Sequence, residues 1–317
     1  MRFWLFAAAI GLSSFALTSI ASSAAIAGIS ARAARRLARY SAKSRAAWLF
    51  RLRVLPAALA IVISLGVAVP VYLAYEPAES AESLSLTLIA FAVTGAALLA
   101  LGTWRAAAAW RATEAVRRDW LRRGRRVEGF DTAIPLFAID EVFPTVAVVG
   151  VRHPALFIAE QVLRECTRDE VAAMLRHEAA HVTVGDNLKR FVLRASPDLL
   201  RAAGTLERAW ACAAEEAADA AAAAAAPGSA IDVAQALIRI ARLAPSSRTP
   251  ELASAFYPGG SIESRVHQLL RSTPAPEAPV PFGCVMLLGT ALGLVALVVT
   301  AAPLLHQLME AVVRIAP

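Results

Sequence analysis

Residues 167–185 read Thr-Arg-Asp-Glu-Val-Ala-Ala-Met-Leu-Arg-His-Glu-Ala-Ala-His-Val-Thr-Val-Gly and predict a helix with defined ends. Thr167 and Glu170 have the spacing of a capping box, in which each side chain satisfies the other residue's free backbone N–H group. Gly185 is a typical C-terminal stop. Apolar side chains recur between these ends at helical intervals, at Val171, Met174, Leu175 and Val182.

This predicted helix contains His177-Glu178-Ala179-Ala180-His181. Positions four apart share a helix face, so both imidazoles can reach one zinc ion at ~2.0–2.1 Å. Glu178 lies at the edge of such a site, where it can act as general base toward a water molecule. The chain has five histidines, so this spacing arises by chance on the order of 1 % of the time. The alternatives are a solvated surface helix and a metal site without catalysis.

A catalytic zinc site normally has three protein ligands. Glu215 is the best candidate for the third, on a later predicted helix at about 206–226. Asp219 follows one turn later on the same face. Its carboxylate can accept the second N–H group of a ligand histidine, His177 or His181, and fix the tautomer. Glu216 is the rival ligand.

The composition indicates a membrane protein. The chain has 317 residues, 58 % of them hydrophobic, and a net charge of +7, which is more apolar than soluble domains usually are. Segments long enough to cross a bilayer lie at about 3–29, 55–75, 84–103 and 282–305. The first could instead be a signal peptide, although its basic cluster follows the apolar core. The basic residues flank these segments, so they predict topology and contact with lipid rather than nucleic-acid binding.

The distribution of charge also predicts how the chain is oriented in the membrane. Residues 30–54 carry basic side chains and no acid, whereas the loop after the second span carries Glu76, Glu79 and Glu82 and no base. Arginines recur after residue 104. The positive-inside rule therefore predicts a cytoplasmic middle segment, with both termini outside the inner (cytoplasmic) membrane. We expect three units: 1–104 with three spans and a basic loop, 105–280 as a cytoplasmic domain, and 281–317 with the fourth span.

The predicted cytoplasmic domain mixes strands and helices. Two β-rich runs at 146–151 and 155–159 flank Arg152-His153-Pro154 and predict a hairpin. Further helices are predicted at 187–203, with a break at Pro197, and at 231–243. The cysteines are too far apart for a disulfide framework, which fits a reducing compartment: Cys166, Cys212 and Cys284.

These features resemble the membrane zinc peptidases of the M56 type, the family of the β-lactam sensor-transducers, and the neighbouring M48 family. The similarity covers about residues 1–305. It rests on the hairpin up to Ile158, the helix 167–185 followed by Asp186, the motif Glu215-x-x-Ala218-Asp219, and Ser264-Arg265-Val266-x-x-Leu269-Leu270.

The resemblance implies a mainly α-helical, multi-pass protein with four transmembrane helices and a small α+β, zincin-like (gluzincin) domain. It implies one Zn²⁺ ion on His177, His181 and Glu215, with Glu178 as general base. It also implies that a substrate peptide adds to the strand near 155–159. The large extracellular sensor of the β-lactam sensors has no counterpart here, so antibiotic sensing and a repressor substrate do not carry over.

The expected activity is zinc-dependent endopeptidase cleavage of a cytoplasmic or membrane-proximal protein, in a regulatory role. The alternatives are a housekeeping, M48-like quality-control peptidase and a non-catalytic membrane adaptor. Three residues could stabilise a reaction oxyanion: Tyr257, Arg265 and His267. A surface or core role is favoured for Arg265 and His267.

Overall fold

The computed structural model describes residues 2–76, 84–197, 202–226, 228–243 and 262–270. Three helical rods in these ranges are long and apolar enough to cross a membrane. They are α1 (Arg2–Leu37), then α2 (Ala42–Ile63) continued by the π-helical η1 (Ser64–Ala68) and α3 (Val69–Tyr75), and finally α4 (Leu86–Arg123). The first three predicted spans are therefore helical. The fourth predicted span lies outside the described residues.

The sequence had predicted a basic loop in the segment 30–54, but this segment is mostly helical. Helix α1 continues to Leu37 and α2 begins at Ala42, so only a short turn joins them. Alanine, leucine and arginine are all strong helix formers, and the positive-inside rule gives a side of the membrane rather than a secondary structure. The arginine-rich stretch after residue 104 continues α4 as far as Arg123. The proposed domain boundary at residue 104 thus falls within one helix, and the division into units stays a prediction.

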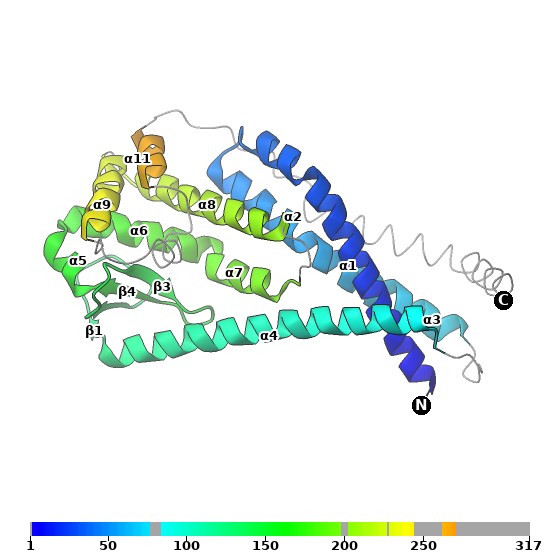
Figure 1. The fold of residues 1–317 in the computed structure, drawn as a ribbon. Coiled ribbons are helices and arrows are strands. Elements are labelled where there is room, and N and C mark those ends of the chain that lie inside the picture. Colours follow the sequence, from blue (N-terminus) through cyan, green and yellow to red (C-terminus); the bar gives the residue numbers. More distant parts are fainter. Residues whose placement is uncertain (1, 77–83, 198–201, 227, 244–261, 271–317) are drawn as a thin grey trace.

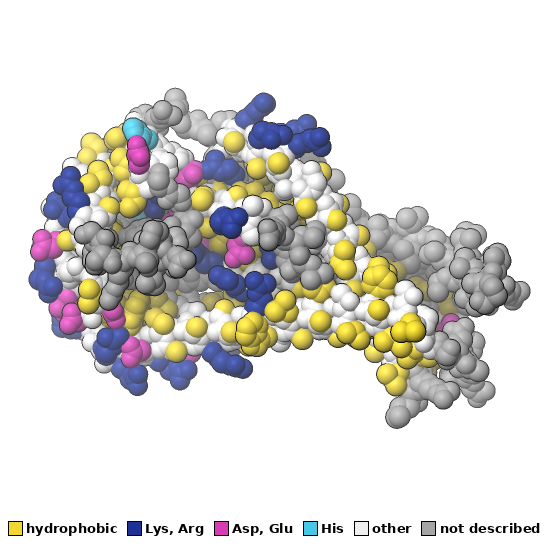
Figure 2. Space-filling model, viewed as in Figure 1, with side chains coloured by type: hydrophobic (Ala, Val, Ile, Leu, Met, Phe, Trp, Pro, Cys, Tyr) yellow, Lys and Arg dark blue, Asp and Glu magenta, His cyan; other side chains and the backbone are white. Residues whose placement is uncertain are grey.

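One end of the molecule is apolar and the other is charged. Figure 1 shows α4 running along the whole length, with α1 crossing it near α3. In Figure 2 hydrophobic side chains cover this crossing, whereas arginines, lysines and carboxylates gather toward the opposite end. The helices approach closely at Gly95, where a Cβ atom would overlap the carbonyl oxygen of Leu12. A glycine that lets two backbones approach this closely is typical of packed membrane helices.

A four-stranded sheet lies at the charged end. Its strands, in the order β1-β2-β4-β3, are β1 (Arg125–Arg126), β2 (Leu136–Ile139), β4 (Ala155–Ala159) and β3 (Val146–Val149). The predicted hairpin is confirmed as the antiparallel pair β3–β4, and β1 and β2 were not predicted. Strand β4 also pairs with β2 in parallel, so it has no free edge. The expectation of strand addition at 155–159 is therefore wrong, because β3 and not β4 is the edge strand on this side of the sheet.

Six shorter helices complete the described chain: α5 (Glu160–Glu165), α6 (Arg168–Val184), α7 (Asp186–Ala195), α8 (Ala202–Ala223), α9 (Ser229–Leu243) and α11 (Ile262–Leu270). Helix α6 covers one face of the sheet, where Val171 and Leu175 pack with Leu156. The end of α4 covers the other face, where the rings of Trp120 and Phe157 meet at 5.2 Å. The sheet is thus held between α4 and α6.

Helix α8 joins this charged end to the membrane helices. Trp210 and Ala214 of α8 are buried in one cluster with Leu49 of α2. The ion pair between Arg45 of α2 and Glu216 of α8 adds an electrostatic contact. Helix α8 is therefore fixed between the hairpin of α1 and α2 on one side and α6 on the other.

Candidate metal centre

The local sequence sets the ends of α6 as predicted. The Thr167 hydroxyl accepts a hydrogen bond from the Glu170 N–H (3.2 Å), and the Glu170 carboxylate accepts one from the Thr167 N–H (2.7 Å). Gly185 ends the helix with φ of 70°, a left-handed conformation that favours glycine. His177 and His181 lie between these ends on one face.

Two imidazoles and one carboxylate converge between α6 and α8. The Nε2 atoms of His177 and His181 are 3.2 Å apart. The Glu215 carboxylate oxygens lie 3.4 Å from Nε2 of His177 and 3.6 Å from Nε2 of His181. Tetrahedral ligands at ~2.0–2.1 Å from zinc are about 3.3 Å from each other. The donor types and their spacing therefore suit one zinc ion, and all three donor atoms lie within 4.8 Å of one another.

The far nitrogen of each ring has its own carboxylate. Nδ1 of His177 is 2.9 Å from Asp219, and Nδ1 of His181 is 2.8 Å from Asp186. A proton on each Nδ1 leaves the Nε2 lone pairs directed at the centre. The sequence left open which histidine Asp219 contacts, and the structure places it at His177. The role of Asp186 was not predicted. It follows Gly185, and the left-handed turn there brings its side chain back toward His181.

Arg265 of α11 compensates the buried carboxylates. Its Nε and Nη2 atoms are 2.6 and 2.7 Å from the two oxygens of Asp219, and Nη1 is 3.4 Å from Glu215. Burial alone would raise the pKa of Asp219, but Arg265 and His177 lower it below its usual value. Arg265 thus has the core role that the sequence favoured. His267 is exposed, and Tyr257 lies outside the described residues.

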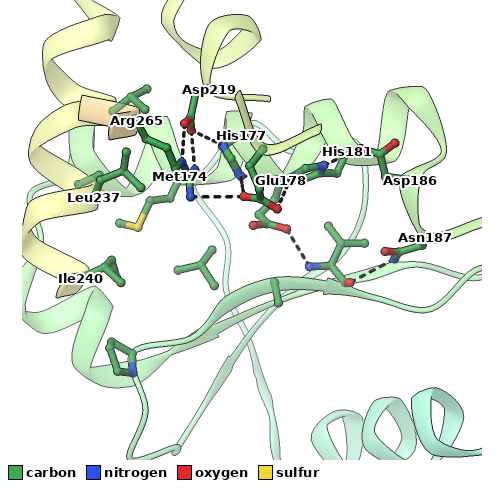
Figure 3. Close-up of a pocket in the computed structure, with 18 of the residues that line it drawn as sticks. Met174, His177, Glu178, His181, Asp186, Asn187, Asp219, Leu237, Ile240 and Arg265 are labelled. Carbon is green, nitrogen blue, oxygen red and sulfur yellow. Dashed lines mark hydrogen bonds and ion pairs between the residues drawn. The ribbon is translucent and has the colours of Figure 1, made fainter. Parts of the chain in front are cut away.

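Glu178 faces the free edge of the sheet. Its carboxylate accepts a hydrogen bond of 3.1 Å from the backbone N–H of Val148 in β3. On the same edge, the Asn187 amide donates to the carbonyl oxygens of Val148 (3.2 Å) and Gly150 (2.9 Å). In Figure 3 the side chains of Glu178 and Asn187 both lie beneath the two histidines, next to the strand. Nothing in the sequence pattern indicated the part played by Asn187.

The rival ligand Glu216 points away from this centre and pairs with Arg45. Glu215 faces the histidines, because adjacent residues on a helix point about 100° apart. The placement therefore favours Glu215 as the third donor.

The centre opens into a cleft of about 300 Å³. Its polar wall is formed by the two histidines, the carboxylates around them, Asn187 and Arg265. Its apolar wall includes Met174 of α6 together with Leu237 and Ile240 of α9, on the side of the cleft away from His181 (Figure 3). The cleft can therefore hold an apolar side chain beside the metal-ligand donors.

Comparison with known proteins relates this region to peptidases. The family model of peptidase family M48 matches residues 148–255, a segment that contains α6 and α8 with all five predicted site residues. No curated protein matches the chain. Among five matching chains of solved structures is S. mikatae Ste24p. Its identity is 13 % and its TM-score 0.35, with 70 % of this chain and 64 % of that chain covered. The family match and the apolar helices support a membrane metallopeptidase.

Proposed function

We propose that the chain is a zinc-dependent membrane endopeptidase that cleaves a cytoplasmic or membrane-proximal protein. The observation that carries the proposal is the convergence of His177, His181 and Glu215, with Glu178 beside them at the edge of β3. Donors of these types at these separations are typical of a catalytic zinc site with one open position.

Each residue has a defined task in this proposal. Zinc in such a site supplies a Lewis acid that polarises a peptide carbonyl and makes water more acidic. Glu178 removes a proton from the attacking water and returns it to the leaving amine, as general bases of this kind do. Asp219 and Asp186 hold the two imidazoles in the tautomer that directs Nε2 inward. The N–H group of Val148 fixes the direction of the Glu178 carboxylate at the wall of the cleft.

The finer proposal is an M56-type peptidase with a regulatory role and a cytoplasmic centre. The sequence motifs around Glu215 and Arg265 support the M56 type. The orientation is supported by the basic ends of α1 and α4, since Arg35, Arg36, Arg122 and Arg123 lie in their last turns. These turns lie toward the end of the molecule that carries the centre (Figure 1). Positive charge of this kind marks the cytoplasmic side.

The test compares newly formed protein N-termini in cells that carry the wild type, Glu178→Gln or Glu165→Gln. Glu165 is an exposed residue of α5 and provides a matched control. A small set of cleavages lost only in Glu178→Gln would support regulatory proteolysis. Equal profiles from all three folded proteins would contradict catalysis and favour a membrane adaptor.

The M48 match favours one alternative, a housekeeping peptidase that clears misfolded membrane proteins. The same experiment separates the two roles. Loss of many cleavages in unrelated unfolded proteins would favour the housekeeping role, whereas loss of cleavage in one regulator would favour the regulatory one.

A further inference from the structure

A second and larger cavity adjoins the cleft. It has a volume of about 1280 Å³ and lies between α4, the edge of β3 and α7. We call it the α4 groove. Along α4 its lining extends from Trp104 to Trp120. That distance is about 24 Å at 1.5 Å per residue, the length of about seven residues of extended peptide.

The α4 groove is strongly basic. Its lining contains one carboxylate, Glu114, and five arginines: Arg105, Arg117, Arg152, Arg190 and Arg194. Arg117 is bound to Glu114 at 2.9 Å, while Arg190 and Arg194 approach Glu215 and Glu207 at 3.4 and 3.9 Å. Among the described residues Arg105 and Arg152 approach no carboxylate within 4.0 Å. A concave surface with this excess of positive charge attracts anionic ligands.

The groove is continuous with the candidate centre. Ala147, Val148, Asn187 and Arg190 line both cavities. Val148 is also the residue whose N–H group binds Glu178. A chain lying in the groove would therefore pass the general base along the free edge of β3.

The positions of the arginines favour a peptide over a lipid headgroup. Arg105 is the first charged residue of α4, so the membrane surface lies near it. Arg117 is twelve residues further, about 18 Å along the helix. Gly150, two residues before Arg152, lies beside Arg117, because a Cβ there would be 3.1 Å from Cδ of Arg117. A headgroup layer is only about 5–8 Å thick, so it would leave Arg117 and Arg152 uncovered.

On this basis, and resting on the proposed peptidase function, we propose that the α4 groove selects substrates carrying an acidic segment next to the bond that is cleaved. The acidic side chains pair with Arg105 and Arg152, and the adjoining residues extend along β3 into the cleft.

The test measures binding by fluorescence anisotropy to the full-length, zinc-loaded Glu178→Gln protein in detergent, where cleavage is blocked. The probes are a fluorescein-labelled Glu-rich peptide and its Gln-for-Glu counterpart of equal length. The Glu-rich peptide should bind more tightly, and increasingly so at low salt. Adding Arg105→Gln and Arg152→Gln should weaken its binding by about three- to twenty-fold, since each exposed ion pair contributes modestly. The Gln peptide should be affected little.

The matched control is Arg164→Gln with Arg242→Gln, which removes the same charge from α5 and α9, outside the groove lining. The proposal is overturned if both peptides bind equally or if the control weakens binding as much as the groove variant. It is also overturned if the groove variant loses binding only to phosphatidylglycerol vesicles, which would make the groove a lipid site. Hydrolysis of the Gln peptide by protein with Glu178 intact tests the peptidase function separately.

Discussion

The link between Arg265 and Asp219 should be necessary for the stability of the whole centre. Both side chains are 4 % exposed, and two hydrogen bonds of 2.6 and 2.7 Å join them. Arg265→Met would leave Asp219 and the nearby Glu215 without this compensating charge. Loss of one partner of a buried ion pair costs about 3–5 kcal/mol. At about 2–4 °C per kcal/mol for a structure of this size, the melting temperature should fall by about 6–20 °C.

The assay is thermal unfolding of the metal-free, full-length protein in detergent, followed by intrinsic fluorescence. Arg265→Lys should give an intermediate value, because lysine keeps the charge but lacks the planar pair of donors. Arg164→Met is the control, since its pair with Glu160 is 64 % and 38 % exposed. It should change the unfolding free energy by less than about 1 kcal/mol. If Arg265→Met melted within about 2 °C of this control, the reasoning would be refuted.

Four further predictions concern the metal centre, one thiol and the membrane helices. The Glu215→Gln variant should no longer bind one zinc ion per chain, whereas the neighbouring Glu216→Gln variant should still do so. Metal analysis after dialysis measures the zinc content of both variants. In the metal-free chain burial lowers the pKa of His177, but Asp219 and Glu215 outweigh it and raise that pKa to about 10. The ring is therefore protonated at neutral pH, so zinc binding should release a proton. The affinity for zinc should increase as the pH rises toward that pKa. Zinc titration in weak buffer measures the proton release. Burial raises the pKa of the Cys166 thiol to about 11, so maleimide should label it slowly at pH 7 and faster as pH rises, and a pH-independent rate would contradict this. Gly95→Leu should separate α1 from α4 and lower the yield of folded protein by gel filtration, whereas Gly28→Leu, with open space around it, should not.

The sequence was sufficient to predict α6, its two ends and the shared face of its two histidines, because these depend on local rules. Capping by Thr167 and Glu170, the stop at Gly185 and the spacing of His177 and His181 all act within one helix. The placement of Glu215 depends instead on which face α8 turns toward α6. Helical spacing alone left Glu216 as a rival, and the ion pair of Glu216 with Arg45 favours Glu215 as the proposed ligand.

Other features could not be predicted because they depend on tertiary contacts. The contact of Arg265 with Asp219 joins residues 46 positions apart, and no pattern in either segment specifies the pair. Strand β2 was missed because four residues are too few to show a periodicity. Its pairing with β4 is what removes the free edge from 155–159 and leaves β3 to face the centre.

In the proposed membrane peptidase, the length of α4 would set how near the membrane a bond can be cleaved. The helix leaves its apolar section at Arg105, and the β3 edge lies beside Arg117, about 18 Å further along. At about 3.3 Å per extended residue, a substrate anchored in the same bilayer needs about five or six residues between its membrane exit and the bond that reaches Glu178. If α4 is tilted relative to the membrane normal, a shorter spacer suffices; if α4 is perpendicular to the membrane, the full five or six residues are needed. The centre would not reach substrate bonds that lie closer to the lipid than this spacer allows.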